Sequence, residues 1–304
     1  MRARLDVCLR AVNEVLLGKQ SQVRLAMACL LARGHLLVED LPGMGKTTLS
    51  HALARVMGLE FQRIQFTSDL LPGDILGTSV FDKDSGQFVF HPGPIFAELI
   101  LADEINRATP KSQSALLEAM EEKQVTIEGE TRPLPTPFFV IATQNPQDQL
   151  GTFALPESQL DRFLMRISLG YPDRAAEREL LAGADRREML AGLPALLTAG
   201  ELTALQQRVQ QVHAAEPLLN YLQDLIAATR SGRWFLQGLS PRAGIAVLRA
   251  AKAQALLANR NYVAPDDIQA VLPQTIAHRL VPAAGAGRGR VEQVRAMVEA
   301  VPLP

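Results

Sequence analysis

The segment 43–48, Gly-Met-Gly-Lys-Thr-Thr, constrains the fold of this chain more than any other. It follows a short apolar run, His35–Glu39, and opens a segment with helical periodicity, Thr47–Met57. A glycine-rich turn between a buried strand and a helix, with Lys-Thr at the helix start, is typical of a phosphate-binding loop. Because glycine has no Cβ, Gly43 and Gly45 let the backbone approach a phosphate closely. The segment therefore predicts an α/β fold of the P-loop NTPase type.

The residues of this loop have distinct predicted roles. Backbone N–H groups and the helix N-terminus attract an anion. We expect Lys46 to reach the β- and γ-phosphates of ATP and the Thr47 hydroxyl to ligate Mg²⁺. Asp40 stands where the strict pattern has glycine, so its side chain should point away from the phosphates. The loop residues expected to bind nucleotide are Pro42, Gly43, Met44, Gly45, Lys46, Thr47 and Thr48.

Two carboxylates, Asp103 and Glu104, follow the apolar run Leu99–Ala102. The carboxyl ends of parallel strands form the ligand-binding edge of an open α/β sheet. We expect Asp103 to join Thr47 in holding the magnesium of the nucleotide, and Glu104 to polarise the attacking water. A strand that ends in a solvated turn would look the same in isolation. The position after the phosphate loop, beyond one intervening strand, favours the catalytic interpretation.

Apolar runs that alternate with helical patterns predict a parallel five-stranded sheet flanked by helices. Segments flanking Glu128-Gly129-Glu130 predict a hairpin. From about residue 174 onward the patterns are helical, without a convincing strand. We therefore expect a nucleotide-binding α/β domain over 1–172 and an all-helical domain over 173–304. Besides His35–Glu39, the expected strands are Phe61–Phe66, Leu99–Ala102, Phe138–Ala142 and Leu164–Leu169.

Several longer motifs resemble the MoxR branch of the AAA+ ATPases. The resemblance covers residues 36–163 and continues more loosely through Leu239–Arg242 and Pro265–Ile268. It implies a nucleotide-binding core followed by a helical lid. The motifs that carry it are Phe66–Asp74, Ala102–Ala108, Lys111–Glu122, Ala142–Pro146 and Leu155–Phe163.

The resemblance also implies three further catalytic residues beside Glu104. Asn145 resembles the sensor that orients the attacking water, although Asn-Pro is also a plain turn former. Arg162 resembles the arginine finger that a neighbouring subunit supplies to the γ-phosphate. Its alternative is a surface ion pair with Asp161 or Glu157. Arg242 resembles the second sensor, on the lid, although arginines are common at helix starts.

By this resemblance the chain is expected to hydrolyse ATP in order to remodel, mature or activate a partner protein complex, as a chaperone-like hexameric ring. Partners would be further copies of the chain and a client protein, which in related proteins often bears a von Willebrand factor A domain. A nucleotide-dependent scaffold with little turnover is the alternative, and a DNA-associated motor is a weaker one. The formal net charge of −1, from 31 basic and 32 acidic residues, does not favour nucleic acid.

The longest apolar run, Leu25–Ala32, is far shorter than a membrane span. The N-terminus has no apolar signal core. Two cysteines, Cys8 and Cys29, are too few for a disulfide framework. We therefore expect a soluble, cytoplasmic protein that does not insert into a membrane.

Overall fold

The computed structural model describes residues 2–146, 151–183, 185–283 and 289–304. Its strands are β1 (Leu36–Glu39), β2 (Phe61–Gln65), β3 (Gly77–Asp82), β4 (Gln87–Pro92), β5 (Leu99–Asp103), β6 (Gln124–Ile127), β7 (Glu130–Pro133), β8 (Phe139–Gln144) and β9 (Met165–Ile167). Its α-helices are α1 (Arg2–Val15), α2 (Gln20–Leu31), α3 (Lys46–Met57), α4 (Pro72–Leu76), α5 (Pro110–Glu122), α6 (Glu157–Leu160), α7 (Arg174–Ala182), α8 (Arg186–Ala191), α9 (Ala199–Gln211), α10 (Glu216–Arg230), α11 (Pro241–Leu257), α12 (Pro265–Ile276) and α13 (Arg290–Ala300). Short 3₁₀ turns are η1 (Pro94–Phe96), η2 (Ile105–Arg107) and η3 (Ala277–Arg279).

The central sheet has the strand order β2-β5-β8-β1-β9, and each neighbouring pair is parallel. The predicted parallel five-stranded sheet is therefore confirmed. The last strand is shorter than the apolar run 164–169 suggested, because only Met165–Ile167 pairs with β1. In this order β8 separates the strand before the phosphate loop, β1, from the strand that ends in Asp103, β5.

Both faces of the sheet are covered, which explains why its inner strands are almost wholly apolar. Leu99 and Leu101 of β5 pack into the cluster formed with α1, α2, α3 and the C-terminal helices. Ile100 and Ala102 point to the opposite side and pack into the cluster that contains α5. The period-two alternation of a strand thus supplies a separate core for each layer.

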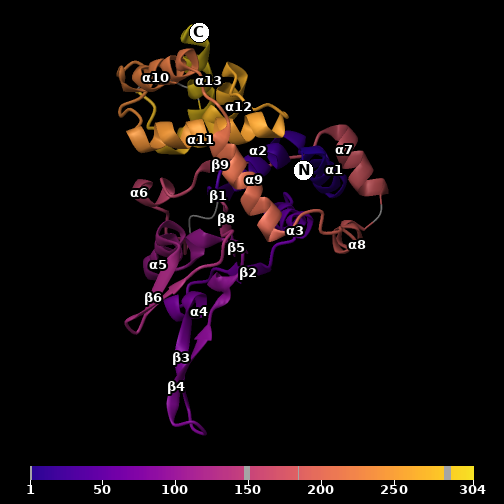
Figure 1. The fold of residues 1–304 in the computed structure, drawn as a ribbon, viewed down its shortest axis with the longest axis vertical. Coiled ribbons are helices and arrows are strands. Elements are labelled where there is room, and N and C mark those ends of the chain that lie inside the picture. Colours follow the sequence, from indigo (N-terminus) through magenta and orange to yellow (C-terminus); the bar gives the residue numbers. More distant parts are fainter. Residues whose placement is uncertain (1, 147–150, 184, 284–288) are drawn as a thin grey trace.

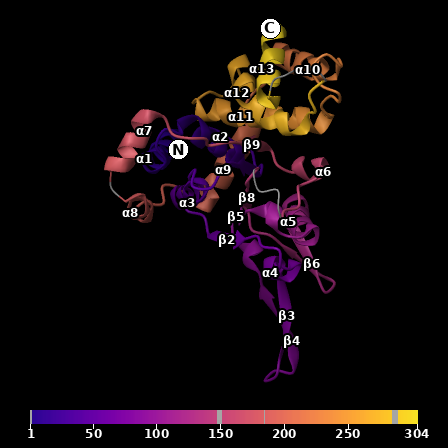
Figure 2. The same ribbon diagram turned by 180° about the vertical axis from the view of Figure 1, so that it is seen from behind.

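The described residues after β9 are helical, as expected, apart from turns and the isolated β-bridges His213–Tyr262 and Phe235–Pro282. Helices α10 to α13 form a body at one end of the molecule, and α7 and α8 lie beside α1 and α3 (Figures 1 and 2). Side-chain bonds tie this region to the core: Gln206 Nε2 donates to Leu30 O at 2.9 Å, and Arg186 Nη1 donates to Glu14 O at 2.8 Å. The domain boundary between residues 172 and 173 stays a prediction.

Two antiparallel hairpins extend from the core on the side of β2 and β5. The hairpin β6–β7 lies where the sequence predicted one. The longer hairpin β3–β4 was not predicted, and it projects away from the body at the end opposite the C-terminal helices (Figure 1). Its base packs closely, since a Cβ on Gly93 would meet Ile75 O of α4 at 2.3 Å. The large apolar side chains exposed on it are Val80, Phe81, Phe88 and Val89.

Candidate functional site

The phosphate loop lies between the carboxyl end of β1 and the start of α3. Gly43 and Gly45 have φ angles of 82° and 92°, in the left-handed region that side chains with a Cβ avoid. Gly45 is the residue before the helix, and Lys46 is the first residue of α3. The Lys46 ammonium donates to the carbonyl oxygen of Asp40 at 2.7 Å. The loop thus gathers backbone donors, a helix N-terminus and a cation around one turn.

Asp40 points away from this turn, as its unusual position required. Its Oδ2 accepts hydrogen bonds from Leu169 N at 2.6 Å, Gly170 N at 2.7 Å and Ser168 Oγ at 3.1 Å. Its Oδ1 accepts from Leu41 N at 3.1 Å. The carboxylate therefore joins the end of β1 to the segment that follows β9.

The two carboxylates after Ala102 lie at the same edge of the sheet as the phosphate loop. Asp103 ends β5, and its Oδ1 accepts a hydrogen bond of 2.6 Å from Thr143 Oγ1 on β8. The backbone N–H of Glu104 donates to the same Thr143 oxygen at 2.9 Å. Glu104 has a left-handed φ of 57°, so the chain turns sharply here. Thr143 was not predicted from the sequence, but its hydroxyl fixes the relative position of both acids.

The edge strand β2 adds two polar side chains that the sequence interpretation missed. Arg63 Nη2 lies 2.5 Å from Asp103 Oδ2, and Gln65 Nε2 donates to Glu104 Oε2 at 3.1 Å. Arg107 Nε also lies 3.3 Å from Glu104 Oε2. A signal for Arg63 and Gln65 existed, since polar residues at i and i+2 share one side of a strand. Both predicted acids are therefore held by neighbouring polar groups.

Asn145 directly follows β8 and is 7% exposed. Because β8 lies between β1 and β5, the end of β8 places Asn145 between the phosphate loop and the acidic pair. The structure thus brings Lys46, Asp103, Glu104 and Asn145 to one edge of the sheet.

The residues present fit a magnesium ion. Thr47 and Asp103 offer oxygen atoms, the ligand type that Mg²⁺ prefers. The described part of the chain holds no cluster of three or more metal-ligating His, Cys, Asp or Glu side chains. An ion held here would therefore take its remaining ligands from nucleotide phosphates and water, which is how Mg²⁺ usually binds beside a phosphate loop.

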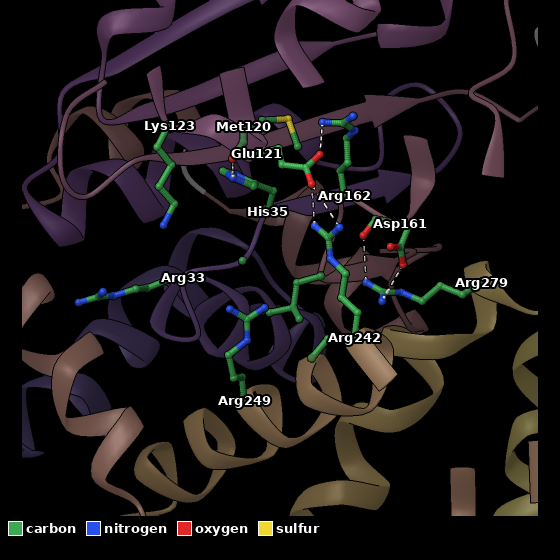
Figure 3. A pocket seen from close by; sticks show the side chains of 13 residues that line it. Arg33, His35, Met120, Glu121, Lys123, Asp161, Arg162, Arg242, Arg249 and Arg279 are labelled. Atoms are coloured by element: carbon green, nitrogen blue, oxygen red, sulfur yellow. Dashed lines mark hydrogen bonds and ion pairs between the residues drawn. The ribbon is translucent and has the colours of Figure 1, made fainter. Parts of the chain in front are cut away.

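Arg162 and Arg242 lie elsewhere, in a pocket at the amino-terminal edge of the sheet (Figure 3). Gly34 and His35, which precede β1, line this pocket, whereas Lys46 follows the other end of β1. A four-residue strand spans about 13 Å. Arg162 was expected to form its alternative ion pair with Asp161 or Glu157, but its guanidinium pairs instead with Glu121 of α5, and so does that of Arg242. The structure therefore does not bring either arginine to the phosphate loop of its own chain.

The fold and this edge define a P-loop nucleoside-triphosphate-binding protein of the AAA+ class. Residues 35–165 match a family model described as ATPase family associated with various cellular activities, and residues 227–300 match an AAA lid domain. Chaperone MoxR1 of Mycobacterium tuberculosis is 40% identical over 89% of this chain and 74% of its own length. YeaC of Bacillus subtilis is 46% identical over 89% of this chain and 84% of its own length.

A crystal structure of a candidate ATPase from Cytophaga hutchinsonii is similar with a TM-score of 0.90 and 36% identity, covering 100% of this chain and 96% of that one. The chain belongs to the MoxR family of AAA+ ATPases. Among the described residues no helix is both long and apolar enough to cross a membrane.

Proposed function

We propose that this chain hydrolyses ATP with Mg²⁺ and uses the energy to remodel or activate a client protein complex as a hexameric, chaperone-like ring. The observation that carries the proposal is the placement of Asp103 and Glu104 beside the phosphate loop, both bonded to Thr143. A scaffold that only binds nucleotide has no need for an acid positioned to polarise water. The naming of a 40%-identical relative as a chaperone supports the client role.

In this proposal Lys46 and the backbone of the loop hold the phosphates, while Thr47 and Asp103 hold the metal, which neutralises phosphate charge. Glu104 takes the proton of the attacking water, and Asn145 orients that water. Gln65 and Arg107 hold the Glu104 carboxylate where it can receive this proton. Phosphoryl transfer requires mainly positioning and charge neutralisation from the protein, which these residues supply.

Arg162 and Arg242 complete the proposed site from a neighbouring copy. Because both lie at the opposite edge of the sheet from Lys46, ring closure would set the arginines of one subunit against the phosphate loop of the next. A guanidinium supplied in this way stabilises the charge that develops on the γ-phosphate. The exposed apolar hairpin β3–β4 is the proposed contact for the client, for which a von Willebrand factor A domain is our first candidate.

The test of hydrolysis is Glu104→Gln. We expect this variant to bind ATP within about twofold of the wild type and to lose turnover about 1,000-fold, since the amide cannot accept the proton. Binding is followed with a fluorescent ATP analogue and turnover by phosphate release. Unchanged turnover would remove Glu104 from the mechanism and favour the scaffold alternative.

The test of shared sites mixes two inactive variants, Arg162→Ala and Lys46→Ala. A mixed ring contains interfaces in which an intact phosphate loop meets an intact arginine, so partial ATPase activity should return. No recovery in assemblies that are shown to be mixed would argue against catalysis in trans. Pull-down with the Glu104→Gln variant in ATP, read by mass spectrometry, identifies the client.

A further inference from the structure

Glu121 is shared between two arginines that come from different parts of the fold. Its Oε2 forms an ion pair with Arg162 Nη1, and its Oε1 accepts from Arg242 Nη1 and Nη2, each at 3.2 Å (Figure 3). Glu121 is the next-to-last residue of α5, Arg162 follows α6, and Arg242 is the second residue of α11. One carboxylate therefore bridges the α/β core and the helical region.

The pocket around Glu121 carries more positive charge than its own carboxylates balance. Its acidic lining residues are Glu121 and Asp161, and Asp161 Oδ1 already pairs with Arg279 Nη1 at 2.9 Å. Burial and then the nearby Arg242 lower the pKa of the Arg249 guanidinium, as expected where cations crowd together. The cationic residues that line the pocket are Arg33, Lys123, Arg162, Arg242, Arg249 and Arg279.

The position of Arg242 is also unfavourable for a purely structural role. A cation in the first turn of a helix opposes the helix dipole, which favours negative charge there. A pocket with this surplus of guanidinium groups suits an anion of higher charge than one carboxylate, and phosphate matches the planar fork of arginine.

We infer that Glu121 is an internal competitor that occupies, in the separate subunit, the place of the γ-phosphate presented by a neighbouring copy. This inference rests on the proposed function, in which that phosphate meets Arg162 and Arg242. When a nucleotide-loaded neighbour docks, its phosphate displaces the Glu121 carboxylate from both arginines. Glu121 thereby restrains assembly with empty neighbours and makes docking depend on the bound triphosphate.

The contacts of Glu121 favour a role as a competitor of phosphate over a role that only holds Arg162 and Arg242 in place. Arg162 Nη1 also donates to the Leu117 carbonyl oxygen at 2.9 Å, so this arginine keeps one anchor when Glu121 is neutralised. The Arg242 side chain is 63% exposed and that of Glu121 is 33% exposed. Ion pairs at such exposure stabilise weakly, so a multiply charged phosphate can replace the carboxylate. The expected restraint is correspondingly small, about fivefold.

The experiment compares Glu121→Gln with Glu122→Gln, the exposed neighbour on α5, in assays of ATPase rate against protein concentration. We expect Glu121→Gln to reach half-maximal specific activity at about fivefold lower protein concentration, with a maximal rate within about twofold of the wild type. Glu122→Gln should match the wild type. In an Arg242→Ala background, Glu121→Gln should lower the protein concentration at half-maximal activity much less. One of the two arginines that Glu121 would otherwise occupy is then already absent.

Two outcomes would overturn the inference. One is a Glu121→Gln curve that coincides with that of Glu122→Gln. The other is a reduced maximal rate, which would make Glu121 a positioning group for Arg162. Glu121→Ala serves as a second variant, and thermal melting confirms that both are folded. If Arg162→Ala keeps full activity and the wild-type rate is independent of protein concentration, the proposed ring mechanism fails instead.

Discussion

The two edges of the central sheet differ in how their charged groups are held. At the carboxyl edge, Asp103 and the Glu104 backbone share the hydroxyl of Thr143, so the acids are fixed by strands that are buried on both faces. At the amino edge, Arg162 and Arg242 meet on the one carboxylate of Glu121, where the side chain of Arg242 is exposed and those of Arg162 and Glu121 are partly exposed. The acids at the carboxyl edge are therefore preorganised for a ligand. The arginines at the amino edge are held by a carboxylate that an anion of higher charge can replace. In the proposed ring, one chain would therefore contribute to two different nucleotide sites.

The largest expected effect is on ATP turnover, and it tests whether the amino edge serves catalysis while the carboxyl edge binds the nucleotide. Arg162→Ala should lower ATP turnover about 1,000-fold, the scale of an arginine finger, and should leave ATP binding within about twofold. Steady-state phosphate release and equilibrium binding of a fluorescent ATP analogue measure the two quantities. Arg178→Ala, an exposed arginine on α7, is the control. If Arg162→Ala retained its turnover, the amino edge would have no part in hydrolysis, and the proposed difference in function between the two edges would be wrong.

At the carboxyl edge, Lys46→Ala should weaken ATP binding about 100-fold, because a charged hydrogen bond to phosphate is lost. Isothermal titration calorimetry measures the dissociation constant. Lys83→Ala, in the turn of the β3–β4 hairpin, should bind as the wild type does. An equal loss in both variants would mean that general charge, not the loop, holds the nucleotide.

A substitution at Asp40 tests whether this residue of the carboxyl edge also stabilises the fold by linking β1 to the segment after β9. Asp40→Asn should lower the free energy of unfolding by about 2 kcal/mol, since both carboxylate oxygens accept hydrogen bonds, whereas an amide has one acceptor oxygen and its NH2 group would face a backbone N–H. Urea unfolding measures this loss, with the exposed Asp224→Asn on α10 as control. A loss below about 0.5 kcal/mol would show that the segment after β9 is held by other contacts.

The amino edge contains two buried neutral histidines. Burial lowers the pKa of His35 to about 4 and that of His278 to about 3. In the unfolded chain both titrate near 6.5, so the unfolded state binds protons first as the pH falls below that value. Stability should therefore be full above about pH 6.5 and should fall as the pH drops toward 4, by about 1.4 kcal/mol per pH unit for each histidine.

His35→Gln should reduce the slope of stability against pH by the contribution of one histidine. His35 Nδ1 accepts from Val140 N at 3.0 Å, a bond that protonation would abolish. Urea midpoints between pH 7 and 5 measure the slope, and the exposed His91→Gln serves as control. The same slope in wild type and His35→Gln would exclude His35 as the titrating group.

Local patterns predicted much of the fold and one edge of the site. The apolar strands are recognisable because both faces of the sheet are buried, and the phosphate loop and acidic pair are each contiguous in sequence. Residues 77–92 were missed, although two short segments rich in Val, Thr and Phe flank Asp84-Ser85-Gly86, which is a hairpin signal. Their apolar side chains are exposed, so no buried partner strengthens the pattern.

The amino edge was beyond local patterns. Glu121, Arg162 and Arg242 meet only because α5, the turn after α6 and the start of α11 converge in the tertiary structure. Sequence suggested Asp161 or Glu157 as partners of Arg162 because they are near in the chain. Long-range pairing of charges depends on packing, which one sequence without its structure does not specify.

The β3–β4 hairpin has a mechanical consequence. Its six paired positions make an arm about 20 Å long at ~3.4 Å per residue. Gly93, at the base of the arm, packs so closely against the backbone of α4 that a Cβ would not fit, so we expect a rotation of α4 to be passed on to the arm. By simple leverage, with the arm length taken from the rise per residue, a tilt of about 10° at the base would sweep the aromatic tip through about 3.5 Å. A small rotation of α4 beside the sheet would therefore produce a larger displacement of the hairpin tip at the far end of the molecule.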